Sequence, residues 1–146
     1  MAINSLAHIG PSAAEAVPAV IRAVEFDNPN VRLAAVNFLL AMGPDAQVRI
    51  SPLIRLVNDK DEGLAWAGLT LVARPARDSP KAMRAVTQAL QHESFRVRGK
   101  AAITLGQLGA RAKEGIPALQ AALKDEYWNV REAAAEALKK IESGKD

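Results

Sequence analysis

The chain has 146 residues with a formal net charge of +3; 49% of them are hydrophobic, 24% charged and 4% aromatic. This composition is that of a globular domain with a substantial core and excludes an intrinsically disordered chain. The absence of Cys excludes disulfides, thiolate metal sites and a cysteine nucleophile. There is no run of 18 apolar residues and no signal-peptide pattern, so we expect a cytoplasmic protein without a membrane span.

The apolar residues repeat with a period of 33 positions. Val31, Leu64, Val97 and Val130 occupy one column of this repeat. Within each unit the apolar residues recur at helical spacing, and about a fifth of the chain is Ala, which favours helices. Each unit is therefore predicted to form two helices. In chain order, helices are expected near residues 2–9, 12–25, 29–42, 45–57, 61–74, 79–91, 94–108, 111–124 and 127–142.

Residues with strong capping preferences mark the ends of these helices. Asn28, Asp61 and Ser94 precede second helices as N-caps, and Pro29 suits the first helical position. Ser79 and Pro80 open a first helix in the same way. Three glycines share the column after the second helix and predict a left-handed C′ residue. They are Gly10, Gly43 and Gly109, and Pro11 and Pro44 follow two of them.

A helical hairpin of this size cannot bury its apolar faces alone, so neighbouring hairpins must stack. The sequence thus predicts an all-α fold, a right-handed α-solenoid of about four and a half 33-residue hairpins. It forms one domain over residues 1–146, with a partial repeat at 1–10 and repeats at 11–43, 44–76, 77–109 and 110–146. Small residues share one column that lets helices approach closely: Ala35, Gly68, Ala101 and Ala134. A large residue there should overpack the core at a cost of about 1–3 kcal/mol.

Residues 116–141, IPALQAALKDEYWNVREAAAEALKKI, resemble a HEAT repeat of the short, phycobilisome-lyase-like class. That pattern has a Pro in the first helix, an Asp eight residues later and Val-Arg at the start of the second helix. Pro117, Asp125, Val130 and Arg131 match it. The resemblance implies a polar ladder between repeats, formed by Arg32, Asp59, Arg98, Asp125 and Arg131. Ala65 and His92 depart from the pattern, which predicts an irregular middle of the array.

The variable, solvent-facing columns of the second helices are free to recognise a partner. In proteins that this chain resembles, these helices line a concave groove. The residues expected there are Leu33, Asn37, Trp66, Thr70, Arg74, Lys100, Ile103 and Gln107. An aromatic side chain within a polar rim is typical of a protein-binding hot spot. We therefore expect a non-catalytic scaffold that binds a protein or peptide, although Trp66 and Ile103 could instead fill a tightly curved interior.

Charge is concentrated in the middle of the chain. Residues 74–113 contain nine basic and two acidic side chains, a net charge of +7, whereas residues 1–73 and 114–146 each carry −2. Such a block can attract an acidic protein or peptide. Nucleic-acid binding through the same block is an alternative, and HEAT-like DNA glycosylases show that this scaffold can hold nucleic acid.

No motif for catalysis, cofactor binding or metal binding is recognisable. His8 and His92 lack other ligands at a metal-binding spacing. The resemblance leaves open a lyase-like, chromophore-handling subunit, but a fold alone says little about function. The chain begins within a unit, which suggests a fragment of a longer array. Ile3, Leu6 and Ile9 would then expose an apolar N-terminal edge suited to end-to-end contact.

Overall fold

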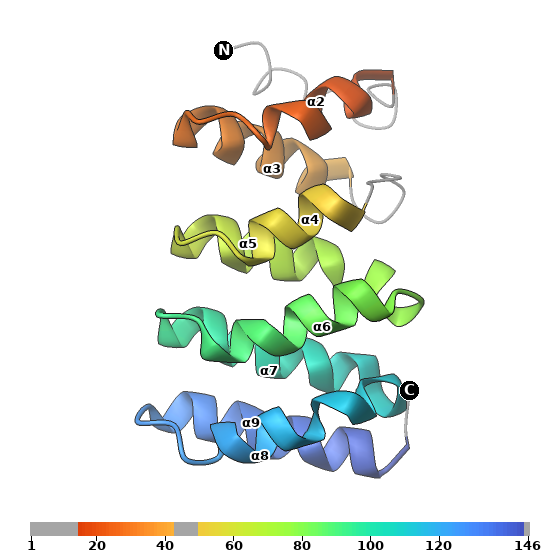
Figure 1. The fold of residues 1–146 in the computed structure, drawn as a ribbon, viewed down its shortest axis with the longest axis vertical. Coiled ribbons are helices and arrows are strands. Elements are labelled where there is room, and N and C mark those ends of the chain that lie inside the picture. Colours follow the sequence, from red (N-terminus) through yellow and green to blue (C-terminus); the bar gives the residue numbers. More distant parts are fainter. Residues whose placement is uncertain (1–14, 43–49, 145–146) are drawn as a thin grey trace.

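A computed structural model of the chain describes residues 15–42 and 50–144. Its regular structure within these ranges is entirely helical, which confirms the predicted all-α solenoid (Figure 1). The α-helices are α2 (Val17–Ala23), α3 (Pro29–Met42), α4 (Ile50–Val57), α5 (Glu62–Val72), α6 (Pro80–Gln88), α7 (Phe95–Leu108), α8 (Ile116–Ala122) and α9 (Trp128–Glu142). The 3₁₀ segments are η3 (Pro75–Arg77), η4 (Ala89–Gln91) and η5 (Gly109–Gly115). The expected helix at 2–9 and the expected caps at Gly10, Pro11, Gly43 and Pro44 lie outside the described residues.

The helices form four hairpins, α2–α3, α4–α5, α6–α7 and α8–α9, which stack in chain order (Figure 1). The second helices α3, α5, α7 and α9 contact one another in that order and make up one layer. The first helices make up the other layer. Equivalent positions of successive second helices therefore lie side by side on one surface. No described helix has both the length and the apolar character that crossing a membrane requires.

The capping residues form the hydrogen bonds that begin these helices. Asp61 Oδ1 accepts from the Leu64 backbone N–H at 2.9 Å, which satisfies one otherwise unpaired donor of the first turn of α5. The Ser79 and Ser94 hydroxyls each accept from a backbone N–H of α6 and α7 at 3.2 Å. Asn28 Oδ1 accepts from the Asn30 N–H at 2.9 Å, at the start of α3. The bounds of α3 are those that the sequence predicts.

The helix expected at 111–124 is a 3₁₀ segment followed by a shorter α-helix. Ala112 leaves helical geometry at φ −91° and ψ 19°, and α8 begins only at Ile116. Gly109 has the expected positive φ of 56°, but its ψ of −137° lies outside the left-handed helical region. The helix expected at 61–74 ends at Val72, and two residues separate it from η3, which begins at Pro75. The helix expected at 79–91 divides into α6 and η4.

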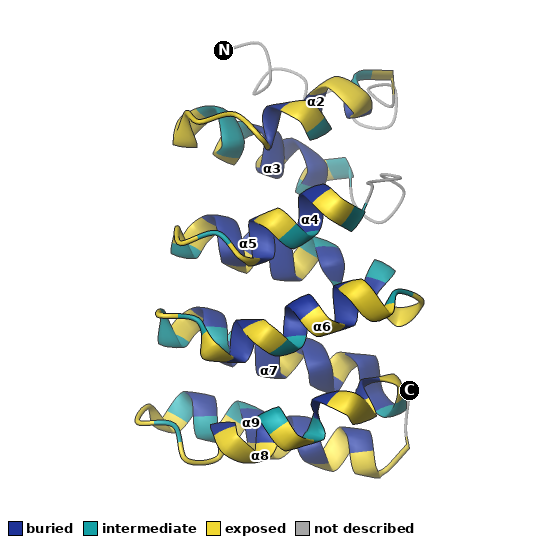
Figure 2. Ribbon diagram, viewed as in Figure 1, coloured by how far each residue is buried: buried dark blue, intermediate teal, exposed yellow. Residues whose placement is uncertain are grey.

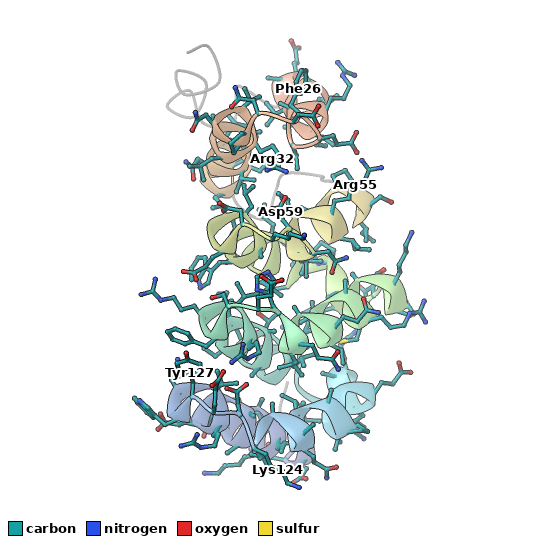
Figure 3. All side chains as sticks on the ribbon, turned by 60° about the vertical axis from the view of Figure 1, so that its left-hand side comes forward. Phe26, Arg32, Arg55, Asp59, Lys124 and Tyr127 are labelled. Atoms are coloured by element: carbon teal, nitrogen blue, oxygen red, sulfur yellow. The ribbon has the colours of Figure 1, made fainter. Side chains whose placement is uncertain are left out.

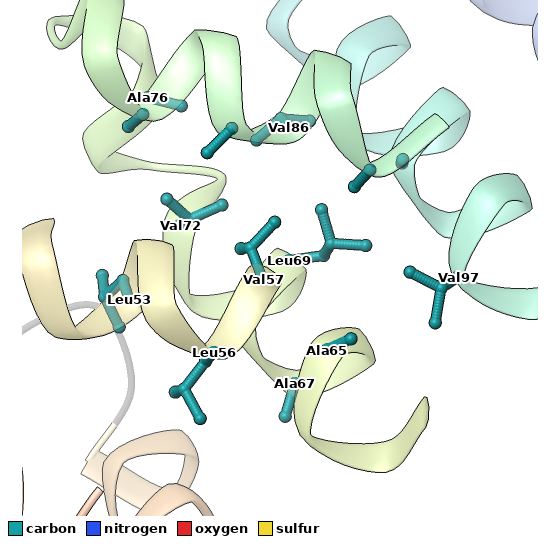
Figure 4. Packing of buried hydrophobic residues seen from close by; sticks show 14 of the residues in the cluster. Leu53, Leu56, Val57, Ala65, Ala67, Leu69, Val72, Ala76, Val86 and Val97 are labelled. Carbon is teal, nitrogen blue, oxygen red and sulfur yellow. The ribbon is translucent and has the colours of Figure 1, made fainter. Parts of the chain in front are cut away.

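The core between the two layers is built from aliphatic side chains and Ala (Figures 2 and 4). Leu56, Val57 and Leu69 are among the side chains packed there. A Cβ atom on Gly68 would lie 2.6 Å from the Val57 backbone nitrogen, so only Gly fits where α5 crosses α4. Phe38 is the one aromatic residue in this core among the described residues.

Candidate partner-binding site

The eight residues predicted to face a partner occupy neighbouring positions on three second helices and the turn after α5. We call them the Trp66 stripe: Leu33, Asn37, Trp66, Thr70, Arg74, Lys100, Ile103 and Gln107. Residues four apart on one helix share a face, so each helix contributes a short row to the same surface. All are exposed except Lys100, which is half-buried. Leu33, Trp66 and Ile103 leave 45%, 44% and 48% of their surfaces open to solvent, a large apolar exposure on one side of a small protein.

Trp66 and Lys100 interact across the boundary between α5 and α7. The Lys100 ammonium nitrogen lies 4.5 Å from the centroid of the Trp66 ring, within the range of a cation–π contact. Burial lowers the pKa of Lys100 from its ordinary value. Trp66 and Lys100 therefore form one unit within the stripe.

Two further features shape the surface around Trp66. The Thr70 hydroxyl donates to the Trp66 carbonyl oxygen of its own helix at 3.1 Å, so its donor already has a partner. Gly99 occupies the column of Trp66 on the next second helix, and a Cβ atom there would meet no atom within 4 Å. Because Gly in a helix costs about 1 kcal/mol relative to Ala, Gly99 weakens α7 without serving its packing. It leaves open space at the position where a side chain would project from α7.

Two open pockets lie in the grooves between second helices. One, of about 420 Å³, lies between α5 and α7 at their C-terminal ends. Its lining is Ala73, Arg74, Arg77, Gln107 and Leu108. The other, of about 400 Å³, lies between α7 and α9. Its lining is Ile103, Gly106, Asn129, Glu132, Ala133, Glu136, Ala137 and Lys140. The stripe thus continues into one pocket with basic side chains and another with acidic side chains.

Two of the three predicted ladder arginines, Arg32 and Arg98, connect adjacent repeats. They lie near the N-terminal ends of the second helices, away from the α5–α7 pocket. Arg32 contacts Asp59 at 2.9 Å between α3 and the loop before α5 (Figure 3). Arg98 binds both carboxylate oxygens of Asp125, with Nε–Oδ2 and Nη2–Oδ1 distances of 2.8 and 3.0 Å. Arg131 instead donates to the carbonyl oxygens of Asp125 and Glu126 in its own loop.

Between the loops that precede α5 and α7, the repeat pattern lacks the Arg–Asp pair. A different set of hydrogen bonds joins these two loops. His92 Nε2 lies 2.9 Å from the Asp59 carbonyl oxygen, while His92 Nδ1 accepts from the Ser94 N–H at 3.0 Å. We assign the proton to Nε2 because Nδ1 is the acceptor. Glu62 then accepts from the Ser94 hydroxyl at 2.6 Å and from Arg96 at 3.1 Å. The sequence predicts an irregular middle of the array but does not predict these hydrogen bonds, which join the two loops without an Arg–Asp pair.

The hydrogen bonds at Glu62 also change its ionisation. The Ser94 hydroxyl, followed by the Arg96 guanidinium, lowers the pKa of Glu62. The Arg98 guanidinium similarly lowers the pKa of Asp125 by hydrogen bonding to its carboxylate. Both carboxylates are therefore held in the charged form by contacts to a neighbouring repeat.

A second aromatic surface was not predicted from the sequence. The Phe95 and Tyr127 rings stack with centroids 4.3 Å apart, at the starts of α7 and α9. Trp128 beside them is 66% exposed, more than any other large hydrophobic residue described. Phe95 and Trp128 share one column of the 33-residue repeat, and Tyr127 stands where Asp61 and Ser94 are caps. Aromatic residues in two adjacent columns of the repeat are the feature of the sequence that could have predicted this surface.

Groups of His, Cys, Asp or Glu that could hold a metal ion are not present among residues 15–42 and 50–144. His8 lies outside these ranges, and His92 is engaged with the Asp59 carbonyl oxygen and the Ser94 N–H.

Comparison with known proteins identifies the repeat. A family model described as HEAT repeats matches residues 1–71 and 50–139. No curated protein matches the chain. Among solved structures, the crystal structure of an engineered protein from a structural genomics consortium is similar, with a TM-score of 0.64 and 20% sequence identity. The match covers 88% of this chain and 38% of the engineered one, and at this identity it supports the fold alone.

Proposed function

The chain belongs to the HEAT-repeat family, and we propose that it is a binding scaffold that recognises a protein or peptide segment through the Trp66 stripe. The observation that carries this proposal is the exposure of Trp66, at 44%, between Leu33 and Ile103 on adjacent second helices. When a partner covers these three large apolar side chains, their removal from water makes the free energy of binding more favourable.

The distribution of the aromatic residues supports a recognition role. The chain has three Phe, two Trp and one Tyr, and of these Phe38 alone belongs to the described core. The fold therefore obtains its stability from Ala and aliphatic side chains. Aromatic side chains on a protein surface are enriched at binding hot spots, where they bury a large area with little loss of side-chain freedom.

The cations beside Trp66 favour an acidic partner. Lys100 lies over the ring, and Arg74 and Arg77 line the adjacent pocket with Gln107. A carboxylate placed here would meet positive charge on a partly apolar surface, where charge-assisted hydrogen bonds are strong.

Several basic side chains of the middle segment are already engaged. Arg96, Arg98 and Arg111 form ion pairs with Glu62, Asp125 and Asp78 at 3.1, 2.8 and 3.1 Å. Ion-paired arginines release fewer counterions from a phosphate backbone. We therefore favour an acidic peptide over a nucleic acid as the partner.

The test is a selection of random 12-residue peptides displayed on yeast, sorted for binding to the labelled protein. We expect enrichment of peptides that combine acidic and large apolar residues. Trp66→Ala should abolish that enrichment, while Trp128→Ala, a matched change of an exposed Trp on another surface, should retain it. Equal enrichment with wild type and Trp66→Ala would overturn the proposal.

A further inference from the structure

The pocket between α7 and α9 has an apolar floor and a carboxylate rim. Ile103 and Gly106 contribute from α7, and Ala133 and Ala137 from α9. Gly106 brings the two helices together, because a Cβ atom there would lie 3.0 Å from the Ala137 Cα. The polar groups along the rim are Asn129, Glu132, Glu136 and Lys140. An occupant must therefore combine an apolar portion with a polar or charged end.

The carboxylates on this rim are not fully neutralised. Glu136 forms a 3.8 Å ion pair with Lys140 one turn along α9, and both side chains are more than half exposed. Glu132 is exposed and has no ion pair within the described ranges. Exposed pairs of this kind contribute little to stability, so a ligand cation can displace Lys140.

The two neighbouring grooves therefore carry opposite charge. The α5–α7 groove presents Arg74 and Arg77, and the α7–α9 groove presents Glu132 and Glu136. Ile103 and the open space above Gly99 lie between Trp66 and the acidic rim. A purely acidic partner that crossed both grooves would be repelled at the second.

We propose that the α7–α9 pocket binds a lysine or arginine side chain of the peptide held on the Trp66 stripe. Its aliphatic stem packs on Ile103, Ala133 and Ala137, and its charged end meets Glu132, the arrangement by which long basic side chains cover apolar surface. This inference rests on the proposed function and refines it. The partner segment carries both signs of charge, with the acidic residue at the α5–α7 groove.

The spacing of the two charges follows from the fold. Packed helices lie about 8–10 Å apart, and an extended chain advances about 3.3 Å per residue. Arg74 also lies two helical turns beyond the level of Glu132, which adds roughly 12 Å along the helix axis at about 1.5 Å per residue. A peptide that crosses from one groove to the next therefore places its basic residue about four or five positions from its acidic residue.

The experiment sorts the random 12-residue library against wild type, Glu132→Gln and Trp66→Ala. Glu132→Gln keeps the shape of the side chain and removes its charge. With wild type we expect Lys or Arg to be enriched about four or five positions from Asp or Glu. With Glu132→Gln the frequency of the basic residue should fall to that of the unsorted library while the acidic and apolar preferences remain.

The outcomes separate this inference from the proposed function. Trp66-dependent enrichment of acidic peptides without any basic preference, or with a basic preference that Glu132→Gln leaves unchanged, overturns the inference and leaves the stripe proposal standing. Enrichment that does not depend on Trp66, or none, overturns both. A dimer in sedimentation velocity that Glu132→Gln dissociates would assign the pocket to a second copy and overturn the inference too.

Discussion

Lys100 places its ammonium nitrogen 4.5 Å from the centroid of the Trp66 ring, joining α5 to α7 through a side-chain contact on the surface of the array. The two residues come from successive repeats. Lys100 is half-buried, and this burial lowers the pKa of the lysine. The protonation state of Lys100 is consequently coupled to its contact with Trp66.

The first prediction concerns this coupling. In a Trp128→Phe background, where Trp66 is the remaining Trp, the Trp66 emission should change as Lys100 loses its proton, because the cation leaves the face of the ring. The midpoint should lie below the ordinary lysine pKa of about 10.4. The measurement is a fluorescence titration from neutral to alkaline pH. If the double variant Trp128→Phe/Lys100→Met shows the same fluorescence transition, Lys100 is not its cause.

The second prediction concerns the hydrogen bonds that join the loops before α5 and α7. His92→Ala removes the hydrogen bonds to the Asp59 carbonyl oxygen and from the Ser94 N–H, both near 3 Å. It should lower the free energy of unfolding by about 1–3 kcal/mol, since part-buried partners lose their bonds. Urea denaturation measures the change. The neighbouring exposed residue supplies the control, because Gln91→Ala should stay within about 0.5 kcal/mol of wild type. Equal stability of the two variants would refute a structural role for His92.

The third prediction is a pH dependence of the Arg98–Asp125 rung. Hydrogen bonding from Arg98 holds the pKa of Asp125 below its unfolded value of about 3.9, so the contribution to stability is complete above that value and is lost as pH falls through the folded pKa. The difference in unfolding free energy between wild type and Asp125→Asn should therefore shrink from about pH 5 to pH 2. Glu126→Gln, at a side chain that is 77% exposed, should give a much smaller difference. A difference in unfolding free energy between wild type and Asp125→Asn that stays constant with pH would contradict this account.

The fourth prediction compares two helical glycines. Gly68→Ala should destabilise the fold by about 1–3 kcal/mol, because the new Cβ would lie 2.6–2.8 Å from backbone and side-chain atoms of Val57 and Leu56. Gly99→Ala should stabilise it by up to about 1 kcal/mol, since no atom lies within 4 Å. Thermal unfolding of both variants checks the opposite signs. Two changes of the same sign would show that the two sites are packed alike.

Much of this fold could be predicted because the same pattern of apolar and capping residues repeats every 33 positions. The 33-residue period located the hairpins, and α3, α7 and α9 lie within one residue of their predicted bounds. The exposed positions on the second helices follow from the same helical periodicity, since residues four apart share a face.

The remaining features depend on contacts between repeats. The break at Ala112 has no counterpart in the repeat pattern, and the role of His92 depends on where the Asp59 carbonyl points. Neither can be read from local spacing. The Phe95–Tyr127 stack likewise brings together residues 32 positions apart, and only the alignment of their columns hints at it.

The most direct test of the Trp66 stripe is the affinity of an enriched 12-residue peptide for wild type, Trp66→Ala and Trp128→Ala, measured by fluorescence anisotropy. Trp128 is the main alternative binding residue, because it is 66% exposed, compared with 44% for Trp66. We predict that Trp66→Ala raises the Kd by about 30-fold or more, the effect of losing a hot-spot side chain, and that Trp128→Ala changes it by less than about threefold. A Kd unchanged by Trp66→Ala, or one that depends on Trp128 instead, would contradict recognition through the stripe.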